Sequence, residues 1–296
     1  MKIVGHCRFS YFGRTDTGRD VATLADAEAK LWNAERMAVR FHLFERILLP
    51  SIAAQTDPGF SFVVTCSEAM PAVFHDRLEA ALDGIAQARI LRTAETEIGR
   101  ALKPVMVEAS NGRQDPAVHF RVDDDDALAV DYIARLRAAA AGLRPSTMIT
   151  FPAGVMGFLD AGRGCHRAFH KHAIAIGLAL VKAPADTRTP FQIQHRAYAQ
   201  SNPVYADPTF PAWHYTRHTT NNTNGYDRVI HRDGGVVDIV AENSRKVHPE
   251  FAEGAVTTPE AEAILATAFP HTTGEALRAA IEASADPHAL MAGATA

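Results

Sequence analysis

The sequence has few cysteines, no long hydrophobic run and no excess of positive charge. Its three cysteines, Cys7, Cys66 and Cys165, are far apart and odd in number, which argues against a disulfide framework and against C-x-x-C sites. No stretch approaches the roughly 20 apolar residues of a membrane span, and Ile3-Val4 is too short for a signal-peptide core. The formal net charge of -4 offers no basic surface for nucleic acid. We expect a cytoplasmic protein with no transmembrane segment and no nucleic-acid partner, which could still touch a membrane peripherally.

Several common enzyme motifs are absent too. The chain has no Gly-rich P-loop, no dinucleotide-binding fingerprint, no serine nucleophile elbow and no H-E-x-x-H sequence. Its 296 residues, 47% hydrophobic and 22% charged, are ordinary for a globular protein and fit one α/β domain with additions.

Strand-like and helix-like segments alternate through the first half of the chain. This alternation predicts an α/β fold with a largely parallel sheet covered by helices on both faces. The predicted strands are 2–8, 60–67, 88–93 and 118–122, and the predicted helical regions are 24–55, 71–85 and 127–143.

The second half is less regular. Residues 147–162 and 170–182 read as short strands or loops around glycines, 228–240 as a hairpin with a Gly-Gly turn, and helices begin near Thr258 and Thr273. We therefore expect one domain over residues 1–240 and a C-terminal helical extension over 241–296 that packs on it and ends in a mobile tail.

Four consecutive aspartates, Asp123 to Asp126, separate the last predicted strand of the first half from a helix-like run. They could cap the helix, but its dipole stabilises each charge by only ~0.3–1 kcal/mol, and adjacent carboxylates repel one another. They could instead hold Mg²⁺ or Mn²⁺ at the carboxyl end of a parallel strand, together with substrate phosphates. The run lacks the glycine of a calcium EF-hand loop.

Three segments together resemble one protein family. They are HCRFSYFG at residues 6–13, LLPSIAAQTDPGFSFVVTCSEAMP at 48–71 and FRVDDDDALAVDYIARL at 120–136. The last is similar to the Asp-x-Asp-Asp segment of GT-A-type nucleotide-sugar glycosyltransferases, and the set resembles the rhamnosyltransferase family over roughly residues 2–240. This resemblance implies a GT-A-like fold, a nucleoside-diphosphate sugar donor, an acceptor hydroxyl on a saccharide or other molecule, and Mn²⁺ or Mg²⁺.

The resemblance also implies roles for the aspartates. Asp123 matches the acid near the ribose or sugar hydroxyls and the metal, Asp125 the acid that binds the metal, and Asp126 a supporting position. Asp124 fills the variable place, where a side chain can face solvent. His218 is the candidate for the late histidine that many such enzymes add to the metal site; a structural histidine is the alternative.

Four other positions are candidates. Arg8 follows the first strand, where its guanidinium could bind the diphosphate or simply face solvent. The wider group often has a base-recognising aspartate after the second strand, and here Ser67 or Glu68 stands at that place. Asp160, in a glycine-flanked loop, could be a catalytic acid or base or an ordinary turn residue.

Two other functions remain open from the sequence. A magnesium-dependent phosphotransferase or phosphatase would use one aspartate as a covalent nucleophile. A non-catalytic sugar- or nucleotide-binding protein on a glycosyltransferase scaffold would explain the missing second-strand aspartate. Glycosyl transfer is the favoured function, and rhamnose is the weaker part of that prediction.

Overall fold

The computed structural model describes residues 1–13, 23–160, 163–217 and 256–272. The larger sheet has seven strands in the order β10-β6-β9-β4-β1-β2-β3, so β10 and β3 form its edges. Neighbouring strands are parallel except where β9 pairs with β4 and β6. The predicted mostly parallel α/β fold is confirmed. The strands are β1 (Lys2–Arg8), β2 (Ser61–Ser67), β3 (Ala88–Thr93), β4 (Ala117–Arg121), β6 (Met148–Thr150), β9 (Leu178–Lys182) and β10 (Val204–Ala206).

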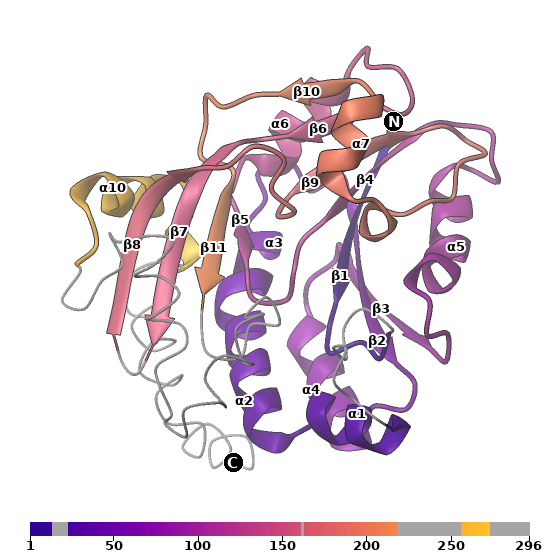
Figure 1. Ribbon diagram of the computed structural model, residues 1–296, viewed down its shortest axis with the longest axis vertical. Coiled ribbons are helices and arrows are strands. Elements are labelled where there is room, and N and C mark those ends of the chain that lie inside the picture. The colour runs from indigo at the N-terminus through magenta and orange to yellow at the C-terminus, as the bar shows by residue number, and fades with distance from the viewer. Residues whose placement is uncertain (14–22, 161–162, 218–255, 273–296) are drawn as a thin grey trace.

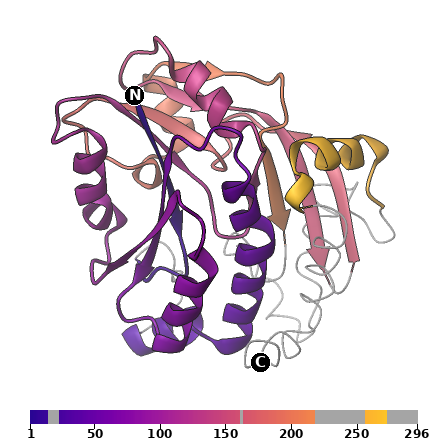
Figure 2. The ribbon, with the colours of Figure 1, turned by 180° about the vertical axis from the view of Figure 1, so that it is seen from behind.

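Helices cover both faces of this sheet (Figures 1 and 2). On one face Phe62 and Phe120 belong to the main apolar core with α2, α3, α4 and α6. On the other face Val4 and Val63 pack with Leu102 of α5, beside η2. The helices are α1 (Leu24–Leu31), α2 (Ala34–Leu43), the π-helix η1 (Phe44–Leu48), α3 (Leu49–Ala53), α4 (Ala72–Leu82), α5 (Ile98–Ala109), α6 (Tyr132–Ala140), the 3-10 helix η2 (Pro190–Gln192) and α7 (His195–Ser201).

A second sheet has four strands in the order β5-β11-β7-β8. The strands are β5 (Ala127–Leu128), β7 (Ala153–Asp160), β8 (Arg163–His170) and β11 (Trp213–Arg217). Figure 1 shows the α2–η1–α3 helix between the two sheets and α10 (Pro259–Ala268) against β8, with the short η4 (Pro270–Thr272) after it. The predicted start near Thr258 is confirmed, because the Thr258 hydroxyl accepts a hydrogen bond from the Ala261 amide at 3.3 Å.

The centre of the large sheet requires a glycine at one position. A Cβ added to Gly5 of β1 would lie 2.3 Å from the Phe120 ring and 2.7 Å from the Phe62 ring. The two phenyl rings therefore occupy the space that any other side chain would need, and they fill the core against α2 and α3.

One predicted boundary is wrong, and several elements, among them α5 and β8, were not predicted. The helix expected over 127–143 begins only at Tyr132, because Ala127 and Leu128 form β5. Helix α5 was not predicted, since Pro104 lies inside it. Strand β8 was not predicted either, because its sequence mixes arginine, histidine and glycine.

Other predictions fall beyond the described residues. The hairpin at 228–240 and the helix near Thr273 lie there, so the boundary between a domain ending at 240 and an extension over 241–296 stays a prediction. Within the described segments, no helix has both the length and the apolar character to cross a membrane.

Candidate functional site

The carboxyl ends of β1, β2 and β4 bring three predicted site residues to one edge of the large sheet. Arg8 is the last residue of β1, Ser67 the last of β2, and Asp123 follows β4 by two residues. The strands are parallel and adjacent, and the Val122 amide donates to the carbonyl of His6 at 3.1 Å. Open α/β sheets bind their ligands at such an edge.

Asp124 and Asp125 share a buried arginine. Nη1 of Arg40, on α2, lies 2.6 Å from Oδ1 of Asp124 and 2.7 Å from Oδ2 of Asp125. All three side chains are buried. The expectation that Asp124 faces solvent is therefore wrong: the residue turns inward because a buried guanidinium needs carboxylate partners.

The charges of this group depend on one another. Burial raises the pKa of Asp124 to about 6, Arg40 opposes that rise and Asp125 adds to it. Burial disfavours the charge of Arg40, but Asp124 and Asp125 outweigh that effect and hold its pKa above the ordinary value. Arg40 therefore carries the positive charge that the aspartate run needs nearby.

Asp126 joins the aspartate run to the second sheet. Its Oδ1 accepts a hydrogen bond from the Thr216 amide at 2.9 Å, and the Thr216 hydroxyl donates to the backbone carbonyl of Asp125. Burial, followed by the charge of Asp125, raises the pKa of Asp126 well above its usual range. The supporting role predicted for Asp126 agrees with these contacts.

Asp123 is the most accessible member of the run. Its side chain is 39% exposed and its Oδ1 lies 2.9 Å from Nη2 of Arg121. The guanidinium of Arg121 lies 4.7 Å from the centre of the Phe191 ring, and that of Arg8 lies 4.5 Å from the same ring. Asp123, Arg121 and Arg8 thus form a polar group on the face of the sheet that η2 covers.

The three aspartates predicted to hold a divalent cation each have a partner within the protein. Asp123 binds Arg121, Asp125 binds Arg40, and Asp126 accepts a hydrogen bond from the Thr216 amide. Within the described segments, no group of three or more histidine, cysteine, aspartate or glutamate side chains is placed to hold a metal ion. His218 lies outside the described residues.

The remaining predicted residues do not form one group. Ser67 is buried, and Glu68 next to it is exposed, with its amide bonded to the Thr93 carbonyl at 2.9 Å. Asp160 is the last residue of β7, and its backbone lies opposite that of Arg163 on the antiparallel strand β8. Its expected place in a loop is therefore wrong, and it belongs to the second sheet.

Sequence reasoning missed Arg40, Arg121, Phe191 and Thr216. The available signal for Arg40 was weak: an arginine between Met37 and Phe41 on the apolar side of a helical pattern. The other three residues are defined by contacts between segments far apart in the chain, which periodicity does not reveal.

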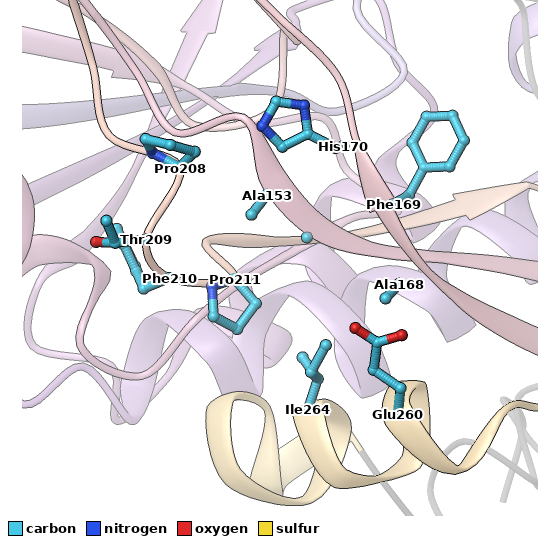
Figure 3. A pocket seen from close by; sticks show the side chains of 11 residues that line it. Ala153, Ala168, Phe169, His170, Pro208, Thr209, Phe210, Pro211, Glu260 and Ile264 are labelled. Atoms are coloured by element: carbon cyan, nitrogen blue, oxygen red, sulfur yellow. The ribbon is translucent and has the colours of Figure 1, made fainter.

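A hollow of about 350 Å³ lies elsewhere, between β7, β8 and α10 (Figure 3). Glu260 and Ile264 approach it from α10, and Pro208 and Phe210 from the segment before β11. None of the predicted site residues lines it.

Comparisons with solved structures find chains of S. aureus TarS. The structure of residues 1-349 with UDP has a TM-score of 0.38 and 12% identity, covering 96% of this chain and 70% of that one. The UDP-GlcNAc complex has a TM-score of 0.41 and 13% identity, covering 97% of this chain and 72% of that one. The structure of residues 1-349 without a named ligand has a TM-score of 0.40 and 11% identity, covering 97% of this chain and 88% of that one. These TM-scores are too low to support an argument.

No curated protein matches the sequence. A family profile does match it, over residues 2–228, which include β1 to β4, the aspartate run and β11. That family is described as "Putative rhamnosyl transferase", and the chain belongs to this glycosyltransferase family.

Proposed function

We propose that the protein transfers a sugar from a nucleoside-diphosphate donor to a hydroxyl group of an acceptor, and that the sugar is rhamnose. One observation carries the proposal: Asp123 and Arg8 lie at the same carboxyl edge of parallel strands in a chain whose family is named for rhamnosyl transfer. That edge is where an α/β sheet holds a nucleotide.

Each residue at this edge has a role in the proposal. Asp123 accepts hydrogen bonds from the ribose or sugar hydroxyls, because its carboxylate is partly open to solvent. Arg8 binds the diphosphate through its planar guanidinium, and Ser67 or Glu68 contacts the base. In this proposal the donor lies across the carboxyl ends of β1, β2 and β4.

In the reaction, the acceptor oxygen attacks the anomeric carbon while the bond from that carbon to the diphosphate oxygen breaks. The acceptor proton passes to a base, and the leaving diphosphate takes up negative charge that the site must stabilise. Asp160 remains a prediction for the base. The divalent cation also remains a prediction, and the contacts of Asp125 and Asp126 do not support it.

The first experiment measures donor binding. We expect one of UDP, dTDP or GDP to bind in calorimetry, and Asp123→Asn to weaken binding of the corresponding nucleotide sugar by about tenfold or more, because a charge-assisted hydrogen bond is lost. The melting temperature should change little, since the Asp123 side chain is partly exposed and such ion pairs contribute little to stability. Asp76→Asn, on the exposed surface of α4, is the matched control and should bind normally.

Turnover then tests the chemistry and the sugar. We expect faster donor hydrolysis with a nucleoside-diphosphate rhamnose than with the corresponding glucose donor. If none of the nucleotides binds, with or without Mn²⁺, the proposal is wrong. Binding without turnover of any donor would instead indicate a non-catalytic binding protein.

A further inference from the structure

One phenyl ring contacts two guanidinium groups at the carboxyl edge of the large sheet. The centre of the Phe191 ring, on η2, lies 4.5 Å from the guanidinium carbon of Arg8 and 4.7 Å from that of Arg121. Arg8 ends β1 and Arg121 ends β4, and these two strands are adjacent and parallel. Guanidinium groups are attracted to the face of an aromatic ring. The ring therefore keeps two cations close to each other although their charges repel.

The position of Phe191 is itself fixed by its surroundings. Its side chain packs on the apolar group beneath α5 that contains Leu102. The Thr189 amide donates a hydrogen bond to Oε1 of Gln192 at 2.9 Å, which closes the turn of η2. A side chain at Gly99 of α5 would collide with Gln192, so the helix and the turn are in direct contact. Phe191 is thus a rigid support for the two arginines.

Arg121 has hydrogen-bond donors that the protein does not use. Its Nη2 donates to Oδ1 of Asp123 at 2.9 Å and to Oδ2 at 3.2 Å. Its Nε is buried and makes no hydrogen bond to the described residues. The carboxylate of Asp123 is 39% exposed, and an ion pair that is open to water is weak. A phosphate oxygen can therefore bind Arg121 at little cost to the rest of the fold.

Two buried side chains on the same face of the sheet also carry an unpartnered polar atom. Thr65 lies opposite Arg8 in the register of β1 and β2, and its Oγ1 makes no hydrogen bond to the described residues. His6 lies opposite Arg121, and its Nδ1 has no partner among those residues either, while its Nε2 contacts Nδ1 of His119 at 2.9 Å. Buried polar atoms almost always bond to protein, water or ligand. This face is therefore suited to receive a polar group next to the arginine pair.

We propose that Arg121 is a second diphosphate-binding residue of the donor site, that it acts as a pair with Arg8, and that Phe191 positions both guanidinium groups. The inference rests on the proposed function and adds the partner that Arg8 needs to bind both phosphates. Without donor, Asp123 neutralises Arg121. When the donor binds, phosphate oxygens accept hydrogen bonds from Arg121, and Asp123 turns to the hydroxyl groups. The two cations then stabilise the charge that the leaving diphosphate gains.

Binding of inorganic pyrophosphate in calorimetry tests Arg121 independently of the nucleotide base. We expect Arg121→Met to weaken pyrophosphate binding by about tenfold, because charge-assisted hydrogen bonds are lost. Arg121→Lys should restore only part of the affinity, since lysine keeps the charge but lacks the planar fork. Arg89→Met is the matched control: Arg89 also pairs with a carboxylate, but it is exposed and lies near the amino end of β3. It should bind pyrophosphate like the unchanged protein.

Asp123→Asn gives a result of opposite sign for two ligands. We expect it to bind pyrophosphate about threefold more tightly, because the carboxylate no longer competes for Arg121 or repels the anion. The nucleotide sugar, whose hydroxyls need that carboxylate, should bind more weakly in the same variant. The measurement is made both in chelator and with Mn²⁺. Weaker pyrophosphate binding by Asp123→Asn with Mn²⁺ would overturn the inference, since Asp123 would then hold the anion through a metal ion.

Two variants of Phe191 test its positioning role. Phe191→Leu keeps an apolar side chain but removes the ring face, and we expect it to weaken pyrophosphate binding by about threefold to fivefold. Phe191→Tyr keeps the ring face and should bind like the unchanged protein. Melting temperatures of both variants are recorded, because a purely structural role would change stability without this difference in binding. Equal pyrophosphate affinity in the two variants would refute the role of the ring.

The outcomes separate this inference from the proposed function. If UDP, dTDP or GDP binds equally well to the unchanged protein and to Arg121→Met, the inference is overturned while the proposed function stands. Pyrophosphate should compete with the nucleotide that binds, and independent binding of the two would also overturn the inference, since the anion would then lie outside the donor site. Failure of all three nucleotides to bind, with and without Mn²⁺, contradicts the proposed function itself.

Discussion

At the residue scale, the four aspartates divide according to what each carboxylate contacts. Asp123 faces the sheet edge, Asp124 and Asp125 bind Arg40, and Asp126 binds the backbone of Thr216. The sequence predicted where these acids lie, because a strand-like run precedes them. It could not predict Arg40 as their partner, since the pairs are 84 and 85 residues apart and arginine on a helix usually faces water.

Removal of Arg40 should be strongly destabilising. We expect Arg40→Met to lower the free energy of unfolding by about 3–5 kcal/mol, because two buried carboxylates lose their partner. Urea denaturation at neutral pH measures this change. Arg46→Met, six residues further along the same helical segment and exposed, should change stability by no more than about 0.5 kcal/mol.

A triple variant checks the cause. Adding Asp124→Asn and Asp125→Asn to Arg40→Met removes the buried charges as well, so part of the lost stability should return. A triple variant less stable than Arg40→Met would show that packing of the arginine stem, and not charge, dominates at this site.

At the element scale, the apolar runs predicted β1 to β4 and the α2–α3 region well, because strand and helix periodicity is strong there. The missed elements have weak or contradictory patterns. Strand β5 has only two residues within a helix-like run, and α5 contains Pro104. Both are set by tertiary contacts: β5 pairs with β11, and α5 packs Leu102 and Val105 on the sheet.

Pro104 should reduce the stability of α5. It is exposed, lacks an amide hydrogen and lies in the middle of the helix. We expect Pro104→Ala to raise the free energy of unfolding by about 1–3 kcal/mol, since the helix regains a backbone hydrogen bond and alanine favours helix. Thermal unfolding measures the gain. Lys103→Ala, at the exposed neighbouring position, should change stability by only a few tenths of a kcal/mol, and a destabilised Pro104→Ala would contradict this account of α5.

At the scale of the whole molecule, four buried histidines link stability to pH. Burial lowers the pKa of His6 to about 3, with Arg89 adding to the effect, and lowers that of His166 to about 4. Burial also holds the pKa values of His119 and His214 well below the ordinary value. An unfolded histidine titrates near ~6.5, so below that pH the unfolded state binds protons that the folded state does not. The histidine contribution to stability is therefore full above that value and is lost as the pH falls.

Asp124 acts in the opposite direction at lower pH. Burial raises its pKa to about 6 in the folded state, so the folded protein holds a proton that the unfolded chain releases above ~3.9. This contribution favours the folded state more as the pH falls through 6. A comparison between variants therefore isolates the histidines better than the absolute pH profile does.

His214→Phe should flatten the acid side of the stability profile. Both ring nitrogens of His214 lack a partner among the residues described, and its ring packs near His166 and Phe269. Between about pH 7 and pH 5 the free energy of unfolding falls in both proteins. We expect this fall to be about 1–2 kcal/mol smaller in the variant, because one buried site no longer resists protonation. Urea denaturation across this range gives the slope. His271→Gln, at an exposed position, is the control, and an equal slope in His214→Phe would refute the assignment.

The edges of the large sheet have a consequence for behaviour at high concentration. An exposed edge strand presents unpaired backbone groups and invites pairing with a second chain. Edge strand β3 carries Arg89 and Arg92, which reach Glu108 and Glu79 on the flanking helices, and the opposite edge, β10, has three residues. The charged side chains on β3 and the short length of β10 both oppose pairing of an edge strand with a strand of a neighbouring molecule. Both features therefore disfavour aggregation through the edges of the sheet.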